Sequence, residues 1–488
     1  MTSQQASMFS PEMGYADLAA TGQALSPLDG RYRPQTQELT QYLSEAALNR
    51  TRIFVEIEWM IELLRRGVIA HAPEISDAEL DYLRALPQNF NADSIAELAQ
   101  IEAVTRHDVK AVEYYIDHRL EAARDVLGPD TVLPSLRPLV HIFATSEDIN
   151  NLSYALNVQA AVRQVWLPRA QALYSRLLEL AQNGADVPML ARTHGQPATP
   201  VTMGKELAVF AYRLSRQLSR IEDAEYLGKM NGATGTWAAH RVALPQVPWP
   251  LLTKDFVERL GLTWNPLTTQ IESHDWQSEL YSDISRFGRI AHNLSTDCWT
   301  YISLGYFHQK LGAQGSTGSS TMPHKVNPIR FENAEANFEI SCALLETLAQ
   351  TLVTSRLQRD LTDSSTQRNI GVALGHSLVA IDNLTRGLEG IELNSRVMAE
   401  ELAQHPEVLS EAIQQVMRLA SLEGREGMEN PYERMKELTR GHDIDIQRLR
   451  EFVSSLDLPE DQKQRLMELT PETYTGYAPD MVDWISAE

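Results

Sequence analysis

The sequence is poor in cysteine. Only Cys298 and Cys342 occur among its 488 residues, so the chain has no disulfide framework and no zinc-binding cysteine spacing. Both lie in stretches whose pattern predicts helices, where we expect them to be packing residues. This cysteine usage predicts a protein of the reducing cytoplasm.

Membrane-directing segments are also missing. Residues 1–23 contain no lysine or arginine and no long apolar run, unlike a signal peptide or a basic transit peptide. No stretch reaches the ~18 apolar residues that a membrane-spanning helix needs. We expect no membrane partner, and we expect residues 1–24 to form a poorly ordered extension.

Basic residues are scarce relative to acidic ones. The chain has 43 Lys and Arg against 65 Asp and Glu, a formal net charge of −22. Such a balance disfavours nucleic acid as a partner. It leaves room for a small anionic substrate, because a few arginines can dominate a closed cleft. Hydrophobic residues make up 43% of the chain, enough to bury a large core.

Long helical periodicities dominate what is present. From about residue 145 to about 390, apolar residues recur every three or four positions, the pattern of helices packed in a bundle. We call each such row of apolar residues a seam. Four of the seams are Met203, Leu207, Phe210, Leu214, Leu218 and Ile221; Leu280, Ile284, Phe287, Leu294 and Ile302; Phe331, Phe338, Cys342, Leu345 and Leu352; and Ile370, Leu374, Leu378, Ile381 and Leu388. The fold class is therefore expected to be all-α.

The spacing of these patterns predicts three helical domains. We expect an N-terminal helical domain at 25–134, a central long-helix bundle at 135–389 and a small helical domain at 390–488. Long helices with wide apolar faces usually need partner helices, which favours oligomerisation. A single helix is expected over residues 100–125, and Pro168 should bend or break the helix that follows Thr145.

The most unusual polar stretch is 315–328, Gly-Ser-Thr-Gly-Ser-Ser-Thr-Met-Pro-His-Lys-Val-Asn-Pro. Glycines allow a mobile backbone, and a row of N–H groups and hydroxyls can hold an anion. Lys325 adds a positive charge for a carboxylate or phosphate. On composition alone, a mobile Gly/Ser surface loop is an equally good interpretation.

Other polar patches interrupt the apolar pattern at loops or helix ends. They contain Arg31 and Tyr32; Arg106, His107 and Asp108; Thr145 and Ser146; Thr193-His194-Gly195; and the charged segment 356–369. Each has an ordinary explanation as a solvated turn, a helix cap or a satisfied polar pair. Each could also bind an anionic ligand.

Taken together, these patches resemble a known family. Gly318-Ser319-Ser320-Thr321-Met322-Pro323-His324-Lys325-Val326-Asn327 resembles the Gly-Ser-Ser-x-Met-Pro-x-Lys-x-Asn motif of the fumarase/aspartase superfamily. That motif is shared by every branch of the superfamily, so it does not choose among them.

The remaining patches point to one branch. Ser-Pro-Leu-Asp-Gly-Arg-Tyr at 26–32, His-Asp-Val at 107–109, Thr-Ser-Glu-Asp-Ile-Asn-Asn at 145–151, Thr-His-Gly-Gln-Pro-Ala-Thr at 193–199 and Gln-Arg-Asp-Leu-Thr-Asp-Ser at 358–364 are similar to the bacterial type of the adenylosuccinate lyase family. The similarity runs from about residue 25 to the end. The N-terminal extension, residues 311–317 and the 421–430 loop depart from it.

The resemblance implies a homotetramer whose central helices form a shared bundle and whose active sites are shared between subunits. It implies β-elimination of fumarate from adenylosuccinate, giving AMP, and from the succinylated aminoimidazole carboxamide ribotide (SAICAR) of purine synthesis. Neither a cofactor nor a metal is expected.

The reaction needs a base for a weakly acidic C–H, a sink for the carbanion and an acid for the leaving nitrogen. Residue chemistry alone favours a histidine as the base, because serine is a poor base at neutral pH. The resemblance instead implies Ser319 as the base and His194 as the general acid. A serine base requires its alkoxide to be stabilised by loop N–H groups and nearby positive charge.

The resemblance also implies a set of substrate-contacting residues. These are Arg31, Tyr32, Arg106, His107, Asp108, Thr145, Ser146, Gln270, Ser320, Lys325, Val326, Asn327, Asn333, Arg359, Ser364 and Arg368. Among them, Lys325 and Asn327 would hold the substrate carboxylate as it gains charge, and the arginines suit bidentate recognition of carboxylate or phosphate.

Two alternatives stay open at this point. One is another fumarate-releasing lyase, argininosuccinate lyase first. The other is a non-catalytic structural relative. Retention of His194, Ser319, Lys325 and Asn327 disfavours the second, because a purely structural role needs none of them.

Overall fold

The computed structural model describes residues 24–310, 322, 325–439 and 445–487. Over these residues the protein is mostly helical, which confirms the predicted helical class. The strands are short and form four two-stranded pairs: β1 with β4, β2 with β3 and β7 with β8 antiparallel, and β5 with β6 parallel. None of the described helices is long and apolar enough to cross a membrane.

The described chain divides into two compact units, each drawn from three stretches. Unit 1 comprises residues 1–165, 225–278 and 347–379, and unit 2 comprises residues 166–224, 279–346 and 380–488. The three consecutive domains expected from the sequence stay a prediction.

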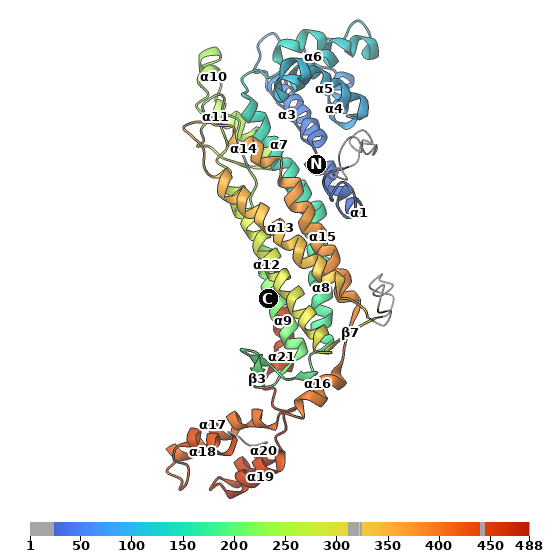
Figure 1. Ribbon diagram of the computed structural model, residues 1–488. Helices are drawn as coiled ribbons and strands as arrows, with labels where there is room; N and C mark the ends of the chain where they lie inside the picture. The colour runs from blue at the N-terminus through green and yellow to red at the C-terminus, as the bar shows by residue number, and fades with distance from the viewer. Residues whose placement is uncertain (1–23, 311–321, 323–324, 440–444, 488) are drawn as a thin grey trace, which may run out of the picture. The chain divides into compact units, whose positions relative to one another are not determined.

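Unit 1 opens with short turns of helix and continues with longer helices (Figure 1). Its first two stretches contain α1 (Arg33–Thr36), η3 (Gln37–Leu39), α2 (Thr40–Leu43), α3 (Glu45–Arg65), α4 (Asp77–Gln88), α5 (Ala92–Thr105), α6 (Asp108–Leu127), η4 (Leu133–Leu139), α7 (Ser146–Ala161), β5 (Leu227–Gly228), α10 (Ala238–Ala243), α11 (Trp249–Arg259) and β6 (Thr263–Trp264). α14 (Thr362–Gln367) lies in the third stretch.

Three long helices contribute residues to both units. They are α12 (Asp275–Ser303), α13 (Ile329–Leu352) and α15 (Ile370–Glu389). Their predicted apolar seams are buried, except that Ile302 is only partly so. Cys298 and Cys342 are both buried free thiols, as expected; burial raises the pKa of the Cys298 thiol above its usual range.

Unit 2 contains the remaining elements. They are α8 (Leu167–Asn183), β1 (Pro188–Met189), β2 (Arg192–Thr193), β3 (Gln196–Pro197), β4 (Val201–Thr202), α9 (Met203–Glu222), β7 (Phe307–Gln309), β8 (Ile391–Leu393), α16 (Ser395–Leu402), η6 (Pro406–Leu409), α17 (Ser410–Leu422), α18 (Pro431–Thr439), α19 (Ile446–Ser455), α20 (Glu460–Glu468), α21 (Ala478–Met481) and η7 (Asp483–Ala487). α8 packs along α9. Gly204 permits this close approach, because a Cβ there would lie 2.4 Å from the carbonyl oxygen of Ala181.

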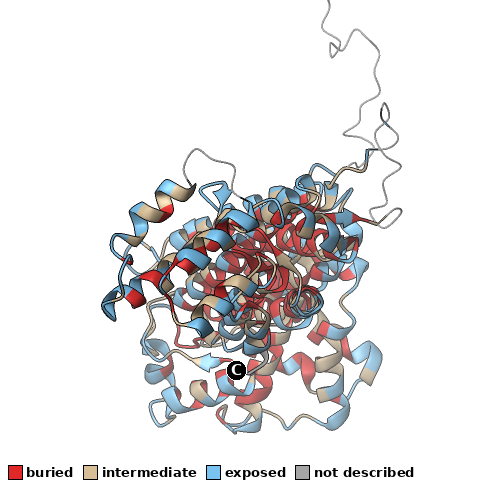
Figure 2. Ribbon diagram, turned by 90° about the horizontal axis from the view of Figure 1, so that it is seen from below, coloured by how far each residue is buried: buried red, intermediate tan, exposed pale blue. Residues whose placement is uncertain are grey.

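Burial follows the amphipathic pattern of the helices, with exposed residues on their outward sides (Figure 2). In unit 1, one hydrophobic cluster joins α3, α4, α5, α6 and η4. In unit 2, a second cluster joins α17, α18, α19 and α20. These cores hold the helix ends and loops that carry the polar residues.

One predicted helix is wrong. Residues 100–125 form the end of α5 and most of α6, with a break between them. Arg106 has a φ of 52° and ends α5, and the Nδ1 atom of His107 then caps α6 by accepting from the N–H of Lys110 at 3.1 Å. A left-handed conformation at a non-glycine residue is uncommon, so helical periodicity alone does not predict this break.

The break predicted at Pro168 is confirmed. α7 ends at Ala161, a π-helical turn covers Val162–Trp166, and α8 begins at Leu167 with Pro168 in its first turn. Proline lacks the N–H that would continue the helical hydrogen bonds, and it is well suited to a first turn.

Candidate active site

Unit 1 contains a cavity of about 600 Å³ lined by segments far apart in sequence. It gathers many of the substrate-contacting residues predicted from the sequence: Arg106, His107, Asp108, Thr145, Ser146, Gln270, Arg359, Ser364 and Arg368. The lining comes from the junction of α5 and α6, the start of α7, the loop before α12 and the segment around α14. The polar interruptions of the apolar pattern therefore meet in one place.

The start of α7 is fixed by a fully buried carboxylate. Asp148 accepts hydrogen bonds from the N–H groups of Thr145, Asn231 and Gly232 at 2.9, 2.9 and 3.0 Å. The ammonium of Lys229, also fully buried, donates to it at 2.9 Å. Such a charge is tolerated in a core only when it is paired and hydrogen-bonded. Asp148 thus anchors the turn that presents Thr145 and Ser146 to the cavity.

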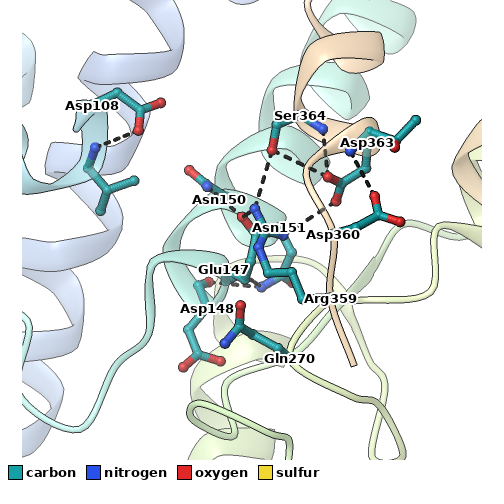
Figure 3. Close-up of polar contacts among 12 residues, drawn as sticks. Asp108, Glu147, Asp148, Asn150, Asn151, Gln270, Arg359, Asp360, Asp363 and Ser364 are labelled. Atoms are coloured by element: carbon teal, nitrogen blue, oxygen red, sulfur yellow. Dashed lines mark hydrogen bonds and ion pairs between the residues drawn. The ribbon is translucent and has the colours of Figure 1, made fainter. Parts of the chain in front are cut away.

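Arg359 is held in a defined orientation. Its guanidinium pairs with Glu147 at 2.9 Å and with Asp363 at 3.5 Å, and it donates to the hydroxyl of Ser364 at 3.3 Å (Figure 3). The side chain is 19% exposed and that of Glu147 3%. A guanidinium bound along one edge keeps its other donors for a ligand.

Asp108 stands on α6, apart from the Arg359 cluster (Figure 3). The buried Arg52 donates to it at 2.7 Å and to the amide oxygen of Asn150 at 2.9 Å. Burial alone would raise the pKa of Asp108, but the charge and hydrogen bond of Arg52 outweigh it and lower the pKa. Asp108 is therefore an ionised carboxylate at neutral pH.

Positive charge is concentrated around this cavity. Four arginines line it, Arg52, Arg106, Arg359 and Arg368, against three carboxylates, Asp108, Glu147 and Glu102. Among the contacts of the described residues, Arg106 has no carboxylate partner. On a chain of net charge −22, this is a local site suited to an anion.

Sequence reasoning missed several lining residues. They lie inside helices, where a polar residue is normally expected on the solvent-exposed face. They are Arg52, Glu147, Asn150 and Tyr154. Burial raises the pKa of the Tyr154 phenol to about 12, so it stays neutral. Two signals were available: Arg52 is a charged residue next to Ile53 and Val55, which the core requires, and Glu147 and Asn150 lie inside the 145–151 motif.

His141 was also missed. Its Nδ1 atom lies 2.6 Å from a carboxylate oxygen of the buried Glu56. Burial lowers the pKa of His141, but Glu56, with a smaller contribution from Glu113, raises it above its usual value overall. This pair holds the segment that leads into α7.

His194 lies in unit 2, at the tip of the hairpin that joins β2 and β3. The backbone φ angle is 53° at His194 and 74° at Gly195, and His194 is exposed to solvent. Arg192, at the base of the hairpin, donates to the hydroxyl of Tyr306 at 3.0 Å and pairs with Glu401 of α16. The histidine is thus presented on a short turn with a fixed base.

The other predicted residues are placed as follows. Lys325 is exposed, the carbonyl of Val326 accepts from the side chain of Gln309 at 2.9 Å, Asn327 precedes α13, and Asn333 lies within that helix. All of these belong to unit 2. Arg31 and Tyr32 belong to unit 1 but are not among the residues that line its cavity. Ser319 and Ser320 lie outside the described residues.

No group of His, Cys, Asp and Glu side chains suited to a metal ion occurs in the part of the chain that the structure describes. Besides its three carboxylates, the cavity is lined by arginines, hydroxyls and amides, which bind anions by hydrogen bonds and charge.

Comparison with family models gives two matches that together span most of the chain. Residues 30–339 match the model described as Lyase, and residues 355–475 match the model described as Adenylosuccinate lyase C-terminal.

Curated relatives match over almost their whole length. The chain is 44% identical to the adenylosuccinate lyase of Haemophilus influenzae over 463 residues, covering 95% of this chain and 98% of the relative. It is also 44% identical to the adenylosuccinate lyase of Escherichia coli K12 over 460 residues, covering 94% and 98%.

Solved structures share the fold at low sequence identity. A fumarate lyase from Mesorhizobium sp. BNC1 has a TM-score of 0.71 at 18% identity, covering 92% of this chain and 97% of the other. The 3-carboxy-cis,cis-muconate lactonizing enzyme from Pseudomonas putida has a TM-score of 0.70 at 20% identity, covering 92% and 96%.

Proposed function

Since the chain belongs to the adenylosuccinate lyase family, carbon–nitrogen lyases of the fumarase/aspartase superfamily, we propose that it eliminates fumarate from adenylosuccinate to give AMP. The same chemistry on SAICAR would release fumarate and the aminoimidazole carboxamide ribotide. We further propose that the enzyme works in the cytoplasm as a homotetramer and needs no cofactor.

The main structural support for assigning residues to substrate binding is the arginine-rich cavity of unit 1. Both substrates carry a phosphate and two carboxylates, so the site must pair several negative charges. Arg106 and Arg368 reach the cavity from different segments, and Arg359 is oriented there by Glu147. Guanidinium groups bind phosphate and carboxylate through two parallel hydrogen bonds.

The proposed elimination also uses His194 of unit 2 and the 318–327 motif, called the signature loop below. In the proposed mechanism, Ser319 takes a proton from the carbon adjacent to the one that carries the departing nitrogen. Lys325 and Asn327 stabilise the carboxylate as it takes up the electrons of that bond. His194 gives a proton to the nitrogen as the C–N bond breaks, leaving fumarate and an amine.

An active site shared between subunits is part of the proposal. The cavity residues and His194 fall in different units of the chain, and the exposed hairpin tip leaves the imidazole open to a ligand. In a tetramer, one subunit would supply the cavity and others the histidine and the signature loop.

The direct test is turnover by the purified protein. Adenylosuccinate should be converted to AMP and fumarate, followed by the change in ultraviolet absorbance, while argininosuccinate should not react. If the protein converted argininosuccinate but not adenylosuccinate, it would be an enzyme of another branch of the superfamily. No turnover of either substrate by a folded tetramer would support a structural relative.

Two variants test the catalytic roles. Ser319→Ala and His194→Ala should each lower kcat by roughly a hundredfold or more, because each removes a proton-transfer group. Exposed residues of the same types provide matched controls, Ser421→Ala and His118→Ala, which should keep wild-type kcat. Near-full activity of the Ser319→Ala enzyme would refute the base assignment.

A further inference from the structure

Three buried ionisable side chains of unit 1 lie near the candidate active site without lining its cavity. They are Glu272, His274 and Asp363, which are 1%, 3% and 6% exposed, and none is among the residues that line the cavity. Ionisable groups are costly to bury unless they are paired and hydrogen-bonded. The proposed mechanism gives none of them a role.

Asp363 connects this group to the cavity. Its Oδ1 atom accepts from the backbone N–H of Ser364 at 2.6 Å and from the hydroxyl of the same residue at 3.3 Å. Its Oδ2 atom lies 3.5 Å from the guanidinium of Arg359 (Figure 3). Arg359 and Ser364 both line the cavity. The position of one buried carboxylate therefore affects two of the predicted substrate-contacting side chains.

His274 contacts the same carboxylate oxygen as Arg359 does. Its Nε2 atom lies 3.3 Å from Oδ2 of Asp363. Its backbone N–H donates to Oε2 of Glu272 at 2.9 Å, and its carbonyl accepts from the N–H of Ser278 in the first turn of α12 at 3.1 Å. The φ angle of His274 is 61°, a conformation that a non-glycine residue keeps only where the surrounding contacts impose it. The imidazole is thus held in place against Asp363.

The charges around the imidazole favour its protonated form. The carboxylates whose charges act on it are Glu272 on its own loop, Asp363 on α14 and Glu147 on α7. Arg359 pairs with the last two, and one guanidinium cannot compensate three carboxylates. Burial lowers the pKa of His274, but the hydrogen bond to Asp363 and the three charges raise it overall. Burial raises the pKa of Asp363, and His274 and Arg359 lower it overall.

We propose that His274 is a positioning residue of the lyase reaction, and that its protonated imidazole fixes Asp363. That carboxylate then orients Arg359 and Ser364 toward the substrate. The inference rests on the proposed function, because it assumes that Arg359 binds the substrate. A neutral imidazole makes a weaker hydrogen bond to a carboxylate than a charged one. When His274 loses its proton, Asp363 is held less firmly, and the arginine loses part of its fixed orientation.

Steady-state kinetics of His274→Gln from about pH 6 to about pH 9 tests the proposal. Glutamine can still donate to Asp363 but never carries the charge. Near pH 6.5, where wild type is charged, the KM for adenylosuccinate should be about tenfold higher in the variant with kcat nearly unchanged. The KM of wild type should rise with pH as His274 loses its proton. The ratio of the two KM values should therefore fall toward one, and a ratio that stays constant would overturn the proposal.

A second variant tests the pair from the other side. Asp363→Asn removes the carboxylate that His274 fixes, so it should raise KM at least as much as His274→Gln does. The double variant should be no worse than Asp363→Asn alone, because His274 acts only through Asp363. Effects that multiply in the double variant would overturn the proposal. If His274→Gln does not fold, Asp363→Asn still decides: its KM should lack the rise with pH that wild type shows, and an equal rise in both would refute the role of His274.

His376→Gln is the matched control, because His376 is also a buried histidine of unit 1 that does not line the cavity. Burial lowers the pKa of His376, so the residue is neutral at neutral pH and its replacement should leave the pH dependence of KM as in wild type. Urea denaturation supplies a measurement that needs no turnover. The unfolding free energy that His274→Gln loses relative to wild type should be largest at low pH and should shrink as the pH rises through the raised pKa of His274.

The two measurements separate the two ways of failing. If the proposed function is wrong, wild type should not turn over adenylosuccinate, while the pH-dependent stability difference of His274→Gln stays. If the positioning role is wrong, wild type and His274→Gln should both turn over the substrate with the same KM at every pH.

Discussion

At the scale of single residues, the candidate site depends on how its arginines are held. Arg359 is bound along one edge by Glu147 and Asp363, whereas Arg106 has no carboxylate partner among the described contacts. A guanidinium that is oriented in advance loses little freedom when a ligand arrives. The fixed and the free arginine should therefore contribute differently to binding and catalysis.

Arg359→Lys should lower kcat/KM by about ten- to a hundredfold, because an ammonium cannot hold Glu147 and Ser364 while binding a carboxylate with two parallel bonds. Steady-state kinetics with adenylosuccinate measures this. Arg356→Lys is the control, since Arg356 lies on the same segment, is 80% exposed and, within the described part of the chain, pairs only with Asp360. Equal effects of the two substitutions would mean that Arg359 acts merely as a charge.

His240 gives a prediction about stability. Both of its ring nitrogens are buried and lack a hydrogen-bond partner among the described residues, and the ring stacks on Phe143 at 5.1 Å. Burial lowers the pKa of His240 to about 4, although the charge of Asp148 raises it slightly. The unfolded chain therefore takes up this proton first as the pH falls.

Wild type should lose up to about 3 kcal/mol of unfolding free energy from this residue as the pH falls from about 6.5 to about 4. His240→Leu removes the titrating group. The difference in unfolding free energy between this variant and wild type should therefore change by the same amount over this pH range. Urea denaturation at several pH values measures the difference. A constant difference would contradict the inference, and His118→Leu should follow the wild-type curve.

At the scale of elements, the β2–β3 hairpin links the proposed general acid to the end of the chain. Arg192 lies two residues from His194 and is bound by Tyr306 and Glu401. The hydroxyl of Thr199, just after the hairpin, donates to Glu411 of α17 at 2.7 Å. Helices of the last hundred residues thus fix the turn that presents His194.

Glu401→Gln should lower kcat by about tenfold with little change in KM, because a loosened hairpin misplaces the proton donor without removing a substrate contact. Glu400→Gln is a close control, since Glu400 is its neighbour on α16 but is exposed and pairs with Arg396. Thermal melting distinguishes a positioning effect from unfolding. A rise in KM at constant kcat would contradict a positioning role.

Much of this could be predicted from the sequence, for reasons that differ between elements. The seam of Met203, Leu207 and Phe210 was predicted correctly because helical periodicity is local. The family was predicted correctly because its motifs are long and specific. The break at Arg106 was missed because it depends on a left-handed backbone at a non-glycine residue, and Arg52 was missed because only packing turns it toward the cavity.

At the scale of the whole molecule, the proposed shared site predicts complementation. Ser319→Ala and His194→Ala should each be nearly inactive alone. After subunit exchange, mixed tetramers should recover part of the wild-type activity, because some sites would then receive an intact Ser319 and an intact His194 from different chains. Native mass spectrometry verifies exchange, and each variant mixed with itself is the control. No recovery in verified mixed tetramers would place both residues on one chain.

The division of each unit among three separate stretches has a consequence for synthesis. Unit 1 begins at the N-terminus but includes residues 347–379, and unit 2 is completed only by the last residues of the chain. At roughly 5–20 residues per second, the N-terminal helices leave the ribosome on the order of ten seconds or more before their last partners. During this time the apolar surfaces that residues 347–379 later cover are exposed, so the nascent chain should depend on chaperones more than a protein whose domains follow one another in sequence.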